Sequence, residues 1–93
     1  MTQSIISDKK ECLICHATQG LHLHHIYEGT ANRKKSDQYG CWCYLCGRHH
    51  NLSNEGVHFK KSLDLKLKRM CQKKFKEAYP DKDFIKIFGR NYL

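Results

Sequence analysis

Cysteine and histidine are the residues most able to do chemistry in this chain, which has six Cys and seven His among 93 residues. Cys12 and Cys15 are spaced so that both sulfurs can bind one tetrahedral Zn²⁺, each at about 2.3 Å. The remaining ligands must come from Cys46 with His49 or from Cys43 with Cys46, because both pairs have suitable spacing. The sequence predicts a structural zinc, and we favour Cys12, Cys15, Cys46 and His49 as its ligands.

The preference for Cys46 with His49 rests on Gly47, which permits the tight backbone turn expected between them. The other cysteines are then expected to be small buried side chains, which is common for free cysteine. They are Cys41, Cys43 and Cys71.

Four further histidines, His24, His25, His50 and His58, exceed what a four-ligand zinc can use. Neighbouring histidines can divide two tasks, one binding a metal and the other moving a proton, because imidazole titrates near neutral pH. We therefore predict a second site with metal chemistry. Two other histidines are expected at the surface or beside a ligand: His16 and His22.

Positive charge is concentrated in the last third of the chain. The whole sequence carries +8, and residues 60–93 hold eleven Lys and Arg against four acidic residues. Such a field favours a polyanion, most commonly nucleic acid, although a solvated helix face is the alternative. Contacts to DNA phosphates are expected from Arg33, Lys34, Lys35, Lys66 and Lys73.

The apolar runs are short. The longest covers residues 41–46, far below the roughly 18 residues that a membrane span needs. The beginning of the chain does not resemble a secretion signal. We therefore expect a cytoplasmic protein with no membrane partner, in which a reducing compartment favours metal binding over disulfides.

The pattern predicts one domain over residues 1–93, with residues 1–11 flexible. Alternation predicts a strand over 21–26, a break over 28–32, an exposed basic stretch over 33–37, a second strand over 39–45 and a short helix near His49.

From Ser62 the apolar period becomes helical, and residues 62–93 are expected to form the helical C-terminal part. Ser62 is the expected N-cap of the first helix, and Pro80 should end it. Its apolar stripe is Leu63, Leu67, Met70, Cys71, Phe75 and Ala78. Asp81 is expected to cap a second helix whose apolar face is Phe84, Ile85 and Phe88 and which Gly89 ends.

Three segments, Leu23-His24-His25-Ile26, Tyr44-Leu45-Cys46-Gly47-Arg48-His49-His50 and Gly56-Val57-His58, together resemble the HNH (ββα-metal) endonucleases. The small zinc-stabilised members found in phage and prophage genomes are the most similar, and the resemblance covers residues 12–93. It implies an α+β fold with a ββα-metal (His-Me finger) core, a structural zinc knuckle and C-terminal helices.

The resemblance also implies an activity, namely hydrolysis of DNA phosphodiester bonds. His25 would be the general base, and His24, His50 and His58 would hold a catalytic Mg²⁺, Mn²⁺ or Ni²⁺ ion. The products would carry 5′-phosphate and 3′-hydroxyl ends. A phage protein complex in a bacterial host is a possible setting, and the oligomeric state is left open.

Three features depart from the family pattern. The central Asn of the motif is missing, because Cys41 or its neighbours hold that place. His58 can be a ligand only if residues 51–57 loop out, whereas a continuous helix would favour Asn54. A regular strand would send His24 and His25 to opposite faces, so the strand must end or twist there.

Two other classes of function use the same residues. A noncatalytic zinc-stabilised DNA-binding module would bind phosphates without any need for His24, His25 or His50. A zinc adaptor would bind other proteins through its apolar stripe.

Overall fold

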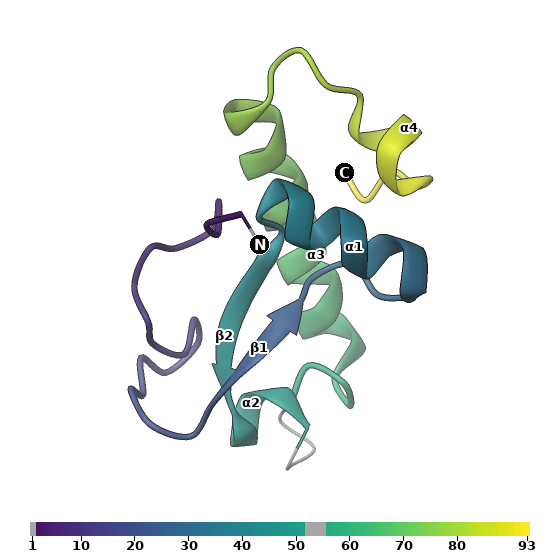
Figure 1. Cartoon of the computed structure of the whole chain (residues 1–93). Helices are drawn as coiled ribbons and strands as arrows, with labels where there is room; N and C mark the ends of the chain where they lie inside the picture. The colour runs from purple at the N-terminus through teal and green to yellow at the C-terminus, as the bar shows by residue number, and fades with distance from the viewer. Residues whose placement is uncertain (1, 52–55) are drawn as a thin grey trace.

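The computed structural model describes residues 2–51 and 56–93 and shows a small α+β fold. The predicted fold class, α+β, is therefore confirmed. Its elements are β1 (Leu21–His25), α1 (Thr30–Tyr39), β2 (Trp42–Cys46), α2 (Gly47–His50), α3 (Lys61–Ala78) and α4 (Phe84–Phe88). The long helix α3 passes behind the pair of strands β1 and β2 (Figure 1). Helices α1 and α4 lie toward one end of this strand pair, and α2 lies at its other end. None of the described helices is both long and apolar enough to cross a membrane.

The two strands form an antiparallel ladder that pairs Leu21 with Cys46 and His25 with Trp42. The inner surface of this ladder is apolar, and Leu45 and Cys43 are almost completely buried. His24 lies opposite Cys43 and is only 2% exposed. The first strand ends at His25. The strand was expected to end or twist there, because a regular strand would send His24 and His25 to opposite faces.

Helix α1 is the main element that sequence patterning missed, since residues 30–39 are helical where a break and an exposed stretch were predicted. The prediction was wrong because the one buried residue of α1 is a serine, Ser36, so no apolar period marks the helix. The second strand also begins later than predicted. Tyr39 is the last residue of α1, and Gly40 ends the helix with φ 73°.

The start of the described chain makes hydrogen bonds to the residues at the end of α1 and the beginning of β2. The indole Nε1 of Trp42 donates to the carbonyl of Thr2, and the Ile5 amide donates to the carbonyl of Gly40. A side chain at Gly40 would collide with the backbone oxygen of Gln3. The close approach of two backbones therefore requires glycine at this position.

Helix α3 follows the predicted stripe through Leu67, Cys71 and Phe75, which are buried. Gln72 is also buried, whereas Ala78 at the end of the stripe is exposed.

The ends of α3 and α4 differ from the prediction in their caps. Lys60, rather than Ser62, is the N-cap of α3, and Pro80 follows the helix as expected. The carboxylate of Asp83, rather than Asp81, accepts the Lys86 amide at the start of α4.

Aromatic rings fill the space between β1, α3 and α4. Phe84 and Phe88 of α4 are buried as predicted, and Gly89 ends the helix in the left-handed region, but Ile85 is 49% exposed. Tyr27 packs against both phenylalanines, with ring centroids 5.1 and 4.6 Å away. Its hydroxyl donates to the carbonyl of Lys68 on α3 over 2.7 Å. The end of β1 is therefore anchored to α3.

Replacing Phe75 tests this core. Phe75 is fully buried, so Phe75→Ala is expected to lower the free energy of unfolding by about 3–5 kcal/mol. Phe59→Ala is the control, because Phe59 is 65% exposed and its loss should change stability by less than about 0.5 kcal/mol. Urea denaturation of the zinc-loaded proteins measures both values, and similar losses for the two variants would contradict this packing.

Candidate metal centres

The predicted zinc ligands converge in the structure. Cys12, Cys15, Cys46 and His49, here called the cysteine cluster, have potential ligand atoms that all lie within 4.8 Å of one another. The Sγ atoms of Cys15 and Cys46 are 3.6 Å apart, and Nδ1 of His49 is 3.2 Å from Sγ of Cys46 and 3.8 Å from Sγ of Cys12. Ligands of a tetrahedral zinc are about 3.5–3.8 Å apart for these bond lengths. The cluster therefore could hold a metal such as zinc.

A tight loop brings the first two sulfurs together. The His16 amide donates to the carbonyl of Cys12, and His16 has a left-handed φ of 65°. The Leu13 amide donates to the carbonyl of Tyr44, which fastens this loop to β2 beside Cys46. Two segments that are distant in sequence thus meet at one end of the hairpin.

The electrostatics of the cysteine cluster favour a metal-binding thiolate at Cys12, whereas burial and the sulfurs of Cys12 and Cys46 raise the pKa of Cys15. Burial opposes ionisation of Cys12, but amides of Cys15, Cys46 and Ile14 stabilise its charged sulfur and lower its pKa to about 6. The thiolate is the form of cysteine that binds metals.

The alternative pairing through Cys43 is not the one that the fold assembles. Cys43 faces the core, where burial raises its pKa to about 12. Cys41 and Cys71 are also fully buried, as expected. Gly47 does not make the predicted tight turn, because it has no positive φ and is instead the first residue of α2.

A second group of imidazoles forms beside the first. His24, His50 and His58, here called the histidine cluster, also have potential ligand atoms within 4.8 Å of one another. Nε2 of His50 lies 3.0 Å from Nε2 of His58. This separation suits an N–H···N hydrogen bond, and it also suits two nitrogens bound to one ion at about 2.1 Å with an angle near 90°.

Two members of the histidine cluster, His24 and His50, are held neutral by their surroundings. Burial, reinforced by the neighbouring histidines, lowers the pKa of His24 to about 3 and that of His50 to about 4. Neutral imidazole has the lone pair that a cation requires. Nε2 of His24 is buried and has no hydrogen-bond partner within the described residues. An unsatisfied buried nitrogen is costly, so a bound cation would relieve a real deficit.

Backbone hydrogen bonds explain how His58 reaches the cluster. The Val57 amide donates to the carbonyl of His49, and the His58 amide donates to the carbonyl of His50. Val57 and His58 therefore lie against α2, which brings the imidazole of His58 next to that of His50. Asn54, the alternative ligand, lies outside the described residues.

His22 supports the histidine cluster from β1. Its Nδ1 lies 2.9 Å from Nδ1 of His50. If the His50 proton is on Nδ1 and is donated to His22, the lone pair on Nε2 of His50 faces the cluster. Hydrogen bonds of this kind orient metal-binding histidines. His22 thus lies beside a ligand, whereas His16 is exposed and pairs with Glu11.

His25 lies next to the histidine cluster with a carboxylate behind it. Its Nε2 is 2.7 Å from Oδ1 of Asp37 on α1. A proton held on Nε2 by Asp37 leaves the lone pair on Nδ1. His25 lines a hollow of about 260 Å³, and the three histidines of the cluster and Arg33 line the same hollow.

Three acidic residues near the imidazoles were missed by the sequence reasoning. Asp37 contacts His25, while Glu28 and Asp64 form a third potential metal group with His24. Glu28 is four residues after His24, which is a weak local signal. Asp64 lies in the first turn of α3, where an acidic residue is favourable in any helix, and nothing in its spacing pointed to His24.

The predicted phosphate contacts differ in their surroundings. Arg33 lies at the histidine hollow, and Lys34, Lys66 and Lys73 are exposed. Lys35 instead donates to the carbonyl of Ile87 over 2.6 Å and joins α1 to α4. That lysine therefore contributes to packing.

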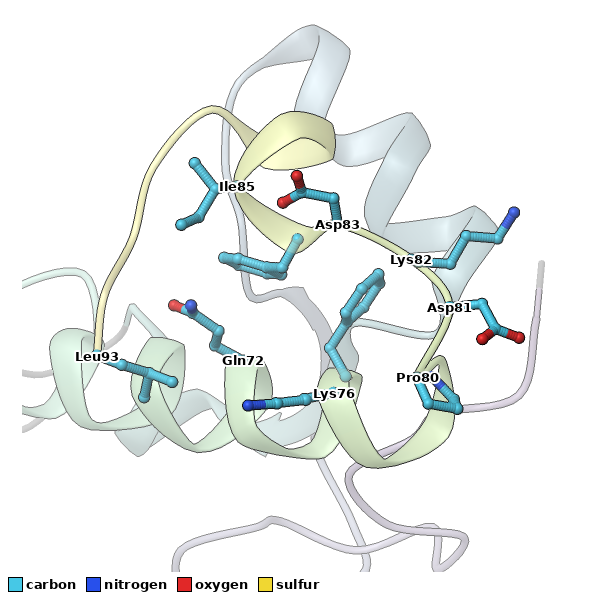
Figure 2. A pocket seen from close by; sticks show the side chains of 10 residues that line it. Gln72, Lys76, Pro80, Asp81, Lys82, Asp83, Ile85 and Leu93 are labelled. Carbon is cyan, nitrogen blue, oxygen red and sulfur yellow. The ribbon is translucent and has the colours of Figure 1, made fainter.

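A larger hollow of about 430 Å³ lies between α3 and α4. Figure 2 shows Gln72 and Lys76 on the α3 side and Asp83 and Ile85 on the α4 side. The ten residues that line it include neither cysteine nor histidine. The smaller hollow at the histidines is therefore the candidate site for chemistry.

Comparison with known proteins identifies no relative, since no family model, curated protein or solved structure matches this chain.

Cys46→Ser tests the cysteine cluster. Loss of one of four ligands is expected to remove bound zinc and to destabilise the fold, because structural zinc contributes directly to folding. Cys71→Ala removes a fully buried sulfur from the core, away from the cysteine cluster, and should retain the zinc. Metal analysis of the purified proteins measures the content, and equal zinc content in the two variants would argue against these ligands.

His22→Ala tests the support of His50. Cation binding at the histidine cluster is expected to weaken by about 10–100-fold, as for other hydrogen-bond partners of ligands. His22→Gln should recover part of the affinity, because its amide oxygen can accept the His50 proton. Calorimetric titration with Ni²⁺ measures the affinities, and unchanged binding by His22→Ala would remove His22 from this role.

Proposed function

We propose that this chain is a metal-dependent HNH endonuclease with a ββα-metal core that hydrolyses phosphodiester bonds of DNA. One observation carries the proposal. The histidine cluster and His25 line the same hollow, although the cysteine cluster could by itself hold a structural metal. A scaffold protein has no need of a second imidazole group with a buried, unpartnered nitrogen.

The order of elements supports this proposal. Two antiparallel strands are followed by a short helix, and His24 and His25 lie on the first strand while His50 lies on the helix. The insertion of α1 between the strands distinguishes this chain from the expected pattern. We infer that the insertion replaces the missing central Asn, because α1 supplies the Asp37 carboxylate that holds His25.

In the proposed reaction His25 takes a proton from water through Nδ1, and the resulting hydroxide attacks phosphorus. The bond from phosphorus to the 3′ oxygen breaks, and the departing oxygen takes a proton from solvent water, which leaves 5′-phosphate and 3′-hydroxyl ends. Asp37 keeps the other proton of His25 on Nε2 and stabilises the imidazolium that forms. A divalent cation held by His24, His50 and His58 would stabilise the charge that develops on the phosphate and on the leaving oxygen.

The surface charge supports DNA as the substrate. Arg33 lies in the hollow, where its guanidinium can bind a phosphate beside the scissile one. Exposed lysines of α3, including Lys66 and Lys73, extend the positive field. Binding through phosphates makes affinity salt-dependent and gives little sequence preference.

His25→Ala is the central test. Nicking of supercoiled plasmid in Mg²⁺, Mn²⁺ or Ni²⁺ is expected to fall by about 10²–10⁴-fold, which is the contribution of a positioned base. Asp37→Asn should lower nicking by a smaller factor, about 10–100-fold. His16→Asn is the matched control, because His16 is exposed and asparagine tolerates its left-handed backbone.

Duplex binding, measured in the same buffers, separates the proposal from its alternative. A His25→Ala protein that binds DNA as wild type does but no longer nicks it supports the endonuclease. Wild-type protein that binds DNA and does not nick it in any of the three metals would instead identify a noncatalytic zinc-stabilised binding module.

A further inference from the structure

Asp64 presents a buried oxygen toward the histidines. It lies in the first turn of α3, and its Oδ2 forms an ion pair with Nζ of Lys68 at 2.8 Å. Its other oxygen, Oδ1, is buried and has no hydrogen-bond partner within the described residues. A lone ion pair with Lys68 thus leaves half of the carboxylate unsatisfied, which is costly away from water.

The same deficit exists on His24. The unpartnered Nε2 of His24 belongs to a side chain that is only 2% exposed, and His24, Glu28 and Asp64 have potential ligand atoms within 4.8 Å of one another. Glu28 also lies 3.9 Å from Nδ1 of His58. One positive ion among these residues would satisfy both orphaned atoms at once.

There is room for such an ion. A hollow of about 350 Å³ is lined by Glu28, Asp64, His58 and Lys61, and it shares Glu28 and His58 with the hollow of about 260 Å³ that His24 lines. This volume accommodates an ion together with several water molecules, which hard divalent cations retain.

We propose that His24, Glu28 and Asp64 form an oxygen-rich cation site that is an alternative to the histidine cluster, because Nε2 of His24 can bind only one ion at a time, and that prefers Mn²⁺ or Mg²⁺. Carboxylates favour these harder ions, whereas a set of imidazoles favours Ni²⁺ or Zn²⁺. The choice of metal in the proposed nuclease then depends on Asp64 and Glu28. The inference rests on the proposed function for the role of the ion, but its test measures binding alone.

The experiment compares Mn²⁺ and Ni²⁺ binding to zinc-loaded protein without DNA. Asp64→Asn is nearly isosteric and is expected to weaken Mn²⁺ binding at least about 10-fold, with a smaller effect on Ni²⁺. Glu28→Gln should act in the same direction, and it alters an exposed residue that the fold does not need. His58→Asn should do the reverse and weaken Ni²⁺ more than Mn²⁺. Electron paramagnetic resonance measures free Mn²⁺, and calorimetry measures Ni²⁺.

Two controls isolate the ligand role of Asp64. Glu77→Gln removes an exposed carboxylate from the same helix and should leave both affinities unchanged. Lys68→Met removes the partner of Asp64 and should leave Mn²⁺ binding unchanged or tighter, because a nearby positive charge is lost. A loss in Lys68→Met equal to that in Asp64→Asn would show that the ion pair matters and would overturn the inference.

The remaining outcomes separate this inference from the proposed function. If wild type binds Ni²⁺ and nicks DNA while Asp64→Asn and Glu28→Gln bind Mn²⁺ as wild type does, the oxygen-rich site is wrong and the nuclease proposal survives. If wild type binds neither ion beyond its zinc, both proposals fail.

Discussion

The two candidate metal centres depend on a single turn of helix. His49 belongs to the cysteine cluster and His50 to the histidine cluster, yet they are consecutive residues of the four-residue α2. Consecutive side chains of a helix point about 100° apart, so one backbone segment can serve both groups but must be held firmly. A helix this short is not stable alone. Binding of Cys46 and His49 to a common ion would fix α2 and thereby fix the direction of His50.

The other half of the histidine cluster depends on the aromatic core. His24 and His25 end β1, and Ile26 and Tyr27 continue directly into the packed interior. The Ile26 amide donates to the carbonyl of Cys41, and the hydroxyl of Tyr27 reaches the backbone of α3. The strand end therefore cannot shift without disturbing the core. The hydrogen bond from Tyr27 to α3 also holds this helix where Asp64 lies close to His24.

The charges around the histidines contrast with the rest of the molecule. Several imidazoles and the carboxylates of Glu28, Asp64 and Asp37 gather in one region of a chain whose net charge is +8. A basic surface attracts a polyanion, while the acidic residues next to the imidazoles attract a cation. Under the proposed function, the two attractions would bring a phosphate and a metal ion beside each other, which is the arrangement that metal-assisted phosphodiester hydrolysis requires.

The sequence by itself determined the local features of this protein. The spacing of Cys12 with Cys15 and of Cys46 with His49 identified two halves of one cluster, because each half lies within a few residues. The apolar period marked α3 through Leu67, Cys71 and Phe75, because a buried helix face must repeat with the helical turn. Only the tertiary structure decided the rest. Helix α1 has no apolar stripe to reveal it, and Asp37 meets His25 across twelve positions because α1 folds back over the end of β1. Asp64 faces His24 because Tyr27 fastens β1 to α3. Residues that meet from separate elements have no fixed separation along the chain, so their contact cannot be predicted from sequence spacing.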